Sequence, residues 1–205
     1  MLARLQWGTR CENLPDLPEG GAVIVGNHRS TIDPLFLQMA VRRPIHWMVA
    51  TGVKQENFAV RWLLRTVESI PVSRRGADQS AVRRAIELVR NGKLVGIFPE
   101  GRVNVDPQFM MPVRPGAVLV ASRASAPMIP CYLEGSPFNG TMLSPLLMTS
   151  TVTIRWGEPI DFFANDDKPE PPACLLEICR EVARLGGRED FEPVLAGKRW
   201  FKELS

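Results

Sequence analysis

Short apolar runs alternate with segments of helical periodicity along most of this chain of 205 residues. The runs are of strand length and end in glycine, proline, asparagine or serine, which is typical of buried β-strands. Strands are therefore predicted over residues 21–28, 44–53, 69–74, 94–101, 127–135 and 151–160.

The segments between these runs repeat their apolar residues at helical spacing. In the clearest of them Val82, Ile86 and Val89 form one stripe, and Asn91-Gly92 ends the helix. Helices are predicted over residues 34–41, 58–67, 80–93, 116–125 and 174–185. Alternating strands and helices are typical of an α/β fold with a mostly parallel sheet flanked by helices.

The length suits a single domain. We expect this domain to cover residues 1–164, with a short N-terminal lead-in. Residues 165–205 are expected to form a Pro-rich linker and a C-terminal amphipathic helix that packs on the same domain.

Charge is unevenly distributed along the chain. Residues 1–125 carry 17 lysines and arginines against 10 acids, whereas residues 126–205 carry 8 against 12. A basic first half favours anionic partners such as phosphate groups or acidic lipid, although it is also compatible with a solvated surface. No recognised nucleic-acid-binding module is present, so nucleic acid is not an expected partner.

The four cysteines form no C-x-x-C pair, and the chain has only two histidines. This composition argues against a metal site and is typical of a reduced, cytoplasmic protein. The N-terminus lacks the apolar core of a signal peptide, and no apolar run reaches the roughly 18 residues of a membrane span. Any membrane contact is therefore expected to be peripheral.

A polar segment, NHRSTID over residues 27–33, connects a predicted strand to a predicted helix, and we call such a segment a polar joint. It places His28 five residues before Asp33. Because Pro34 follows, Asp33 has an ordinary interpretation as a helix N-cap, and His28 as a strand-end histidine. The same geometry also allows chemistry, since a tight loop before the helix folds His28 back onto Asp33. An ionised Asp33 then accepts the proton of one ring nitrogen and leaves the other as a base.

Such a pair is two-thirds of a hydrolase triad, but the third member is missing. There is no G-x-S-x-G motif, and Cys131 lies inside a predicted buried strand. The reacting hydroxyl is therefore expected to belong to a substrate. This predicts direct transfer to an acceptor alcohol, with His28 as general base and no covalent intermediate.

A second polar joint, FPEGR over residues 98–102, follows another apolar run. Pro99 and Gly101 shape a turn, from which Glu100 is expected to point toward an acceptor's hydroxyls. Arg74 and Arg102 offer planar guanidinium groups suited to phosphate. A loop acid and solvated edge cations are the structural alternatives.

Together these motifs resemble the glycerolipid acyltransferases, meaning the lysophosphatidic acid acyltransferase group and its relatives. Their N-H-x-S-x-x-D block is matched by Asn27, His28, Ser30 and Asp33, and their F-P-E-G block by residues 98–101. A block ending in arginine is matched loosely by residues 69–74, and an apolar block around a proline by Pro130. Residues 98–104 read FPEGRVN, however, so Arg102 stands one position earlier than in the family's F-P-E-G-T-R-S.

The resemblance implies transfer of a fatty acyl group from acyl-CoA or an acyl carrier protein to a lysophospholipid such as 1-acylglycerol-3-phosphate. It implies His28 as base with Asp33 as its orienting partner, and no cofactor beyond the acyl thioester co-substrate. The acceptor is then bound by Asn27, Ser30, Arg74, Glu100, Gly101 and Arg102, and Pro130 shapes the acyl-binding wall.

Two other classes remain open from the sequence. One is a lipid-thioester hydrolase, in which water replaces the acceptor on the same base. The other is a non-catalytic lipid-binding adaptor domain. The expected partners include an anionic membrane surface.

Overall fold

The computed structural model describes residues 7–51, 69–73, 79–138, 140, 144–164 and 169–197. The strands in this part of the chain are β1 (Trp7–Glu12), β2 (Ala22–Gly26), β3 (Ile45–Thr51), β4 (Ile70–Ser73), β5 (Leu94–Ile97), β6 (Met128–Glu134) and β7 (Ser150–Trp156). They form one sheet in the order β1-β7-β6-β2-β5-β3-β4. All neighbouring strands run parallel except β6 and β7.

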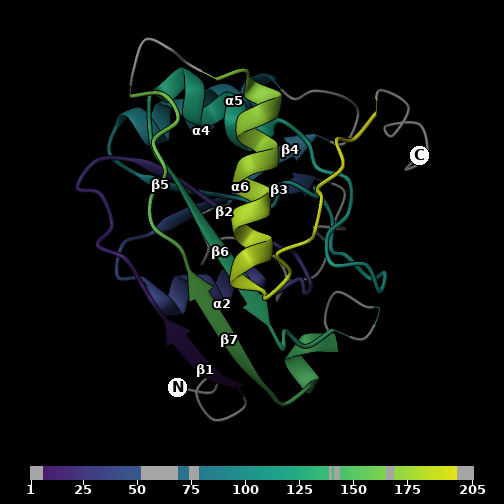
Figure 1. Cartoon of the computed structure of the whole chain (residues 1–205). Coiled ribbons are helices and arrows are strands. Elements are labelled where there is room, and N and C mark those ends of the chain that lie inside the picture. Colours follow the sequence, from purple (N-terminus) through teal and green to yellow (C-terminus); the bar gives the residue numbers. More distant parts are fainter. Residues whose placement is uncertain are drawn as a thin grey trace.

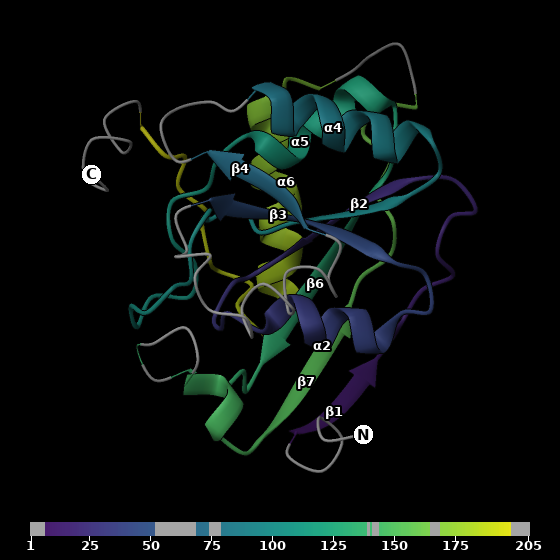
Figure 2. The same cartoon turned by 180° about the vertical axis from the view of Figure 1, so that it is seen from behind.

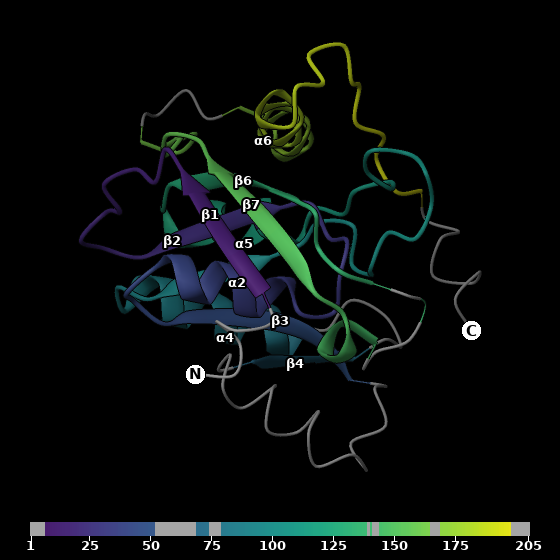
Figure 3. The same ribbon diagram turned by 90° about the horizontal axis from the view of Figure 1, so that it is seen from below.

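Helices cover both faces of this sheet (Figures 1 and 2). They are α2 (Asp33–Ala40), α4 (Gln79–Arg90), α5 (Gly116–Ala124), α6 (Pro171–Leu185) and a short 3₁₀ helix, η1 (Ser144–Leu147). Seen along the sheet in Figure 3, α6 and α2 lie on opposite sides of β6 and β7. The predicted α/β class, with a mostly parallel sheet flanked by helices, is therefore confirmed.

Two separate cores follow from the alternation of side chains along the buried strands. Val25 of β2 packs in the core beneath α4, α5 and α6, together with Ile178. Ile24, its neighbour, points to the other face and packs in the core beneath α2, together with Phe36. Side chains of the segment that follows β2 can therefore lie on either face of the sheet.

Strand pairing brings the two polar joints of the sequence together. β2 pairs with β5 in parallel, with Val25 opposite Ile97 near their carboxyl ends. The segments that follow these strands, residues 27–33 and 98–111, consequently leave the sheet at the same edge. Polar groups commonly collect at this edge in parallel sheets.

Most observed boundaries are shifted by a few residues from the predicted ones; β5, for example, ends at Ile97 instead of residue 101, and β7 ends at Trp156 instead of residue 160. β1 was not predicted, and it pairs in parallel with β7, which lies far away in the sequence. α6 begins at Pro171, three residues before the predicted start, because proline is well accommodated in the first turn of a helix. The predicted helix over residues 58–67 and residues 165–168 of the predicted linker lie outside the described residues. Among the helices that are described, none combines the length and apolar character needed to cross a bilayer.

Candidate active site

The His28 side chain is bonded to the Asp33 carboxylate at the carboxyl end of β2. His28 Nδ1 lies 2.9 Å from Asp33 Oδ2. Because an ionised carboxylate can only accept, Nδ1 carries the proton and Nε2 is the basic nitrogen. Nε2 has no hydrogen-bond partner among the described residues, and the side chain keeps 15% of its surface exposed. The predicted folding of His28 back onto Asp33 is confirmed.

The interpretation of Asp33 as a helix N-cap is wrong. Asp33 is the first residue of α2, Ile32 is the N-cap, and no side chain caps the helix. Instead, Asp33 Oδ2 accepts the backbone N–H groups of Arg29 and Ser30, each at 2.7 Å. The fully buried carboxylate therefore organises the loop that carries His28.

A stack of aromatic rings supports the imidazole from one side. The His28 ring lies 4.2 Å from the Phe98 ring at an angle of 5°. Phe98 in turn lies 4.8 Å from Trp47 at 15°. Gly96 makes room for this arrangement, since a Cβ at that position would come within 2.4 Å of the Trp47 ring. The orientation of the imidazole thus depends on β3 and β5 as well as on its own loop.

Glu100 holds the backbone of His28 from the neighbouring joint. Its Oε1 accepts the His28 N–H at 2.8 Å, and its Oε2 accepts the Met111 N–H at 2.9 Å. The side chain is fully buried, and this burial raises the pKa of the carboxyl group while the two N–H donors oppose the rise. The expectation that Glu100 points out of the turn is therefore wrong. Its predicted contact with an acceptor stays a prediction.

Residues that the sequence analysis did not single out also hold the loop that carries His28. Asn104 donates its N–H to the His28 carbonyl oxygen at 2.7 Å. Arg29 Nη1 donates to the carbonyl oxygens of Asp106 at 2.8 Å and of Asn104 at 3.3 Å. Because these bonds end on backbone atoms, no spacing of residue types in the sequence reveals them.

In this structure the side chains of Asn27 and Ser30 bond to backbone atoms of neighbouring segments and so stabilise the fold around His28. The Asn27 amide both donates to the Leu133 carbonyl oxygen (3.0 Å) and accepts the Leu133 N–H (2.8 Å), which ties the end of β2 to β6. The hydroxyl of Ser30 is fully buried and donates to the Pro137 carbonyl oxygen at 2.5 Å. The Ser30 hydroxyl is therefore not positioned to attack a substrate as a nucleophile. Substrate binding by Asn27 or Ser30 stays a prediction.

Cys131 is buried in β6, as expected. Burial and the nearby charge of Asp33 raise the pKa of its thiol strongly, so the thiol stays protonated at neutral pH. A protonated, fully buried thiol is a poor nucleophile. The structure thus offers no support for a covalent step at this residue.

Two guanidinium groups meet beside the turn that follows β5. Gly101 adopts a positive φ of 72°, and its missing side chain leaves space that the Arg114 side chain borders at 3.5 Å. Arg102 is exposed, and its Nε donates to the Met111 sulfur at 3.4 Å. Burial lowers the pKa of Arg114, and the charge of Arg102 lowers it further. Sequence reasoning gave Arg114 no role.

Of the two remaining predicted site residues, only Pro130 belongs to the described part of the chain, and it lies apart from this cluster. Pro130 is buried in the middle of β6, opposite Val25, and its ring packs near Gly157. It therefore faces α6, whereas the ring of His28 packs on the α2 side. Its role in acyl binding stays a prediction. Arg74 lies outside the described residues.

Comparison with known proteins places this geometry in a family. The model of a family described as Acyltransferase matches residues 8–134, which include both polar joints. A 1-acyl-sn-glycerol-3-phosphate acyltransferase of Bacillus subtilis is 30% identical over 199 residues, covering 93% of this chain and 94% of that protein. The chain belongs to the acyltransferase family, and it is an O-acyltransferase.

More distant relatives agree with this assignment. A chloroplastic 1-acyl-sn-glycerol-3-phosphate acyltransferase of Brassica napus is 28% identical over 129 residues, which are 61% of this chain and 36% of that protein. The crystal structure of the 1-acyl-sn-glycerophosphate acyltransferase of Thermotoga maritima has the same fold, with a TM-score of 0.65 and 20% identity. That likeness covers 91% of this chain and 76% of the Thermotoga chain.

Proposed function

We propose that the protein transfers a fatty acyl group from an acyl thioester to the free hydroxyl of a lysophospholipid such as 1-acylglycerol-3-phosphate. The observation that carries this proposal is the His28–Asp33 pair, with Nε2 as an available base and no side-chain nucleophile among the described residues around it. The names of the relatives support the choice of acceptor, since they act on 1-acylglycerol-3-phosphate.

The reaction then proceeds in one transfer without an acyl-enzyme. His28 Nε2 takes the proton of the acceptor hydroxyl as its oxygen attacks the thioester carbonyl carbon. The negative Asp33 stabilises the imidazolium that forms and fixes its orientation. When the tetrahedral intermediate collapses, a C–O ester bond has replaced the C–S bond, and the imidazolium returns its proton to the departing thiolate.

The test is to incubate the purified protein with a panel of acyl thioesters and a panel of lysophospholipids. Ester product that requires both substrates is the expected result. Release of free fatty acid without an acceptor would indicate the thioester hydrolase instead. Binding of lipid with neither product would indicate the adaptor domain.

Arg102 and Arg114 are our candidates for the phosphate of the acceptor. Two like charges that the fold holds beside Gly101 create a positive potential, which a phosphate dianion would relieve. A guanidinium group matches phosphate with two parallel hydrogen bonds. Arg102 lies two residues after Glu100, whose carboxylate accepts the His28 N–H. The same turn therefore positions both the proposed phosphate site and the proposed base.

Replacing Arg102 by alanine is expected to raise the KM for lysophosphatidate about tenfold, since a charge-assisted hydrogen bond contributes roughly 1.5–3 kcal/mol. The KM for the acyl thioester should change much less. Lysine at this position should restore binding poorly, because a point charge replaces a planar fork. Arg84→Ala, which removes an exposed arginine on α4, is the matched control. Equal increases in both KM values would contradict phosphate binding by Arg102.

Replacing Glu100 by glutamine is expected to lower kcat about tenfold with little change in either KM. Glutamine has one acceptor oxygen, so it cannot accept both the His28 and the Met111 N–H groups, and the base loses part of its support. Steady-state kinetics for both substrates measures this, with the exposed Glu87→Gln as control. If the KM for lysophosphatidate rises while kcat is kept, Glu100 contacts the acceptor, as the family resemblance implies.

Peripheral attachment to an anionic membrane remains part of the proposal, because a long-chain lysophospholipid resides in a bilayer. The basic charge of residues 1–125 supports it through electrostatic attraction. Residues 61–65 (RWLLR) and 198–204 (KRWFKEL) combine cations with large apolar side chains, so they are our candidates for insertion into the membrane. Both segments lie outside the described residues.

A further inference from the structure

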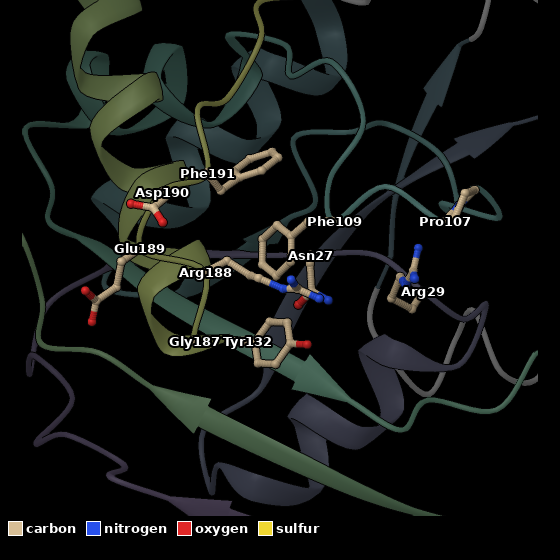
Figure 4. Close-up of a pocket in the computed structure, with 10 residues that line it drawn as sticks. All are labelled: Asn27, Arg29, Pro107, Phe109, Tyr132, Gly187, Arg188, Glu189, Asp190 and Phe191. Atoms are coloured by element: carbon tan, nitrogen blue, oxygen red, sulfur yellow. The ribbon is translucent and has the colours of Figure 1, made fainter.

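A cleft of ≈ 490 Å³ lies on the α6 side of the sheet, next to the catalytic loop (Figure 4). Asn27 and Arg29, the two neighbours of His28 in the chain, both line it. Consecutive Cα atoms are about 3.8 Å apart, so the cleft begins within a few ångströms of the His28 backbone. The ring of His28, however, packs on the opposite side, against Phe98. The cleft is therefore connected to the catalytic base without containing it.

One wall of the cleft is aromatic. The rings of Phe109 and Tyr132 lie 5.6 Å apart at an angle of 16°, and Phe191 lies 5.0 Å from Phe109 at 55°. These rings come from the loop after β5, from β6 and from the segment after α6. Flat, partly exposed rings of this kind bind other flat rings by stacking.

Two arginines, Arg29 and Arg188, and two acids, Glu189 and Asp190, line the same cleft. In Figure 4 the Arg188 side chain extends from the segment after α6 across the cleft, on the side where Phe109 and Tyr132 lie, whereas Glu189 points away from these rings. Arg188 is exposed, and its side chain makes no hydrogen bond or ion pair with another described residue.

Arg29 and Arg188 both lie close enough to Tyr132 to affect its hydroxyl electrostatically. Burial raises the pKa of the Tyr132 hydroxyl, as does Glu134, and the charges of Arg155, Arg29 and Arg188 oppose the rise. Arg29 and Arg188 thus both act on the aromatic wall. All hydrogen bonds that Arg29 makes through its guanidinium to described residues use Nη1.

We propose that this cleft holds the adenosine-phosphate end of an acyl-CoA donor. An aromatic wall beside two guanidinium groups matches a purine ring joined to phosphates. The flexible pantetheine arm of the donor then passes around the end of β2 and delivers the thioester to His28. This inference rests on the proposed acyl transfer and adds which donor is used and where it binds. An acyl carrier protein has no adenosine and gains nothing from this cleft.

The kinetic test replaces Arg188 by alanine, with Arg184→Ala as the matched control. Arg184 lies four residues earlier, in the last turn of α6, pairs with Glu181 and does not line the cleft. Arg188→Ala is expected to raise the KM for acyl-CoA about tenfold and to leave the KM values for lysophosphatidate and for acyl carrier protein donors within about twofold. An unchanged KM for acyl-CoA, or equal increases for acyl-CoA and lysophosphatidate or for both donors, would overturn the assignment.

A binding measurement separates this inference from the proposed function. Adenosine 3′,5′-bisphosphate, which has no pantetheine and no thioester, is titrated calorimetrically into the wild-type protein and the two variants. Binding that Arg188→Ala weakens about tenfold and Arg184→Ala does not weaken is the expected result. Absence of binding to the wild type would overturn the cleft as a nucleotide site even if acyl transfer is observed. Binding that depends on Arg188 in a protein without transferase activity would uphold the cleft and refute the transfer.

Discussion

Replacement of His28 by alanine is expected to lower kcat by about 10²–10⁴, the contribution typical of a general base. The base is lost together with its bond to Asp33, while the loop itself remains held by the two N–H groups that the same carboxylate accepts. Loss of the stacked ring on Phe98 should reduce the free energy of unfolding by only about 0.5–1.5 kcal/mol. Initial rates with saturating substrates, together with a thermal melt, measure both effects.

His46→Ala is the matched control, because His46 is the second of the chain's two histidines and lies on β3. It should keep nearly full activity. If His28→Ala retains more than about a tenth of the wild-type kcat, His28 is not the base, since such a group is expected to supply at least about 10².

Replacement of Asp33 by asparagine is expected to have the second largest effect. In the wild type, Oδ2 accepts from His28, Arg29 and Ser30, whereas Oδ1 is buried without a partner among the described residues. An asparagine that keeps its oxygen at the place of Oδ2 puts an amide N–H₂ at this partnerless position, which costs about 1–3 kcal/mol of stability. It also removes the negative charge that stabilises the imidazolium.

If the introduced amide turned around instead, it would donate to Nδ1 and force the proton onto Nε2, so the base could no longer accept. Either orientation predicts a fall in kcat of about 10²–10⁴, similar to the loss of the orienting carboxylate in comparable pairs. The measurement compares kcat with the fraction folded at the assay temperature. Activity that declines only as far as the folded fraction declines would mean that Asp33 merely organises the loop.

Local patterns explain why much of the fold could be predicted. The fully apolar run of β2 and the helical stripe of α4 are both contained in a few consecutive residues. β1 escaped prediction because Trp7–Glu12 mixes polar, small and aromatic residues, and because an edge strand leaves several side chains exposed. It is stabilised by pairing with β7, a partner that no local pattern reveals.

The same distinction applies to the candidate site. The His28–Asp33 pair could be predicted because five residues of sequence and one helix start determine it. The inward orientation of Glu100 could not, because its partners are backbone N–H groups of residues 28 and 111 that meet only when β2 pairs with β5. The cleft proposed for the nucleotide is lined by residues 27, 29, 107, 109, 132 and 187–191, so it exists only after α6 has packed.

In the proposed reaction, the stack of three rings also determines the direction from which an acceptor reaches His28. Phe98 covers one face of the imidazole and Asp33 occupies its Nδ1 edge. The lone pair of Nε2 lies in the plane of the ring, so a hydroxyl must arrive edge-on, parallel to the planes of Phe98 and Trp47. The choice between acceptors that carry their free hydroxyl at different positions of the glycerol backbone then depends on the approach angle, because hydroxyls of equal acidity differ in whether their carbon skeleton clears the stack.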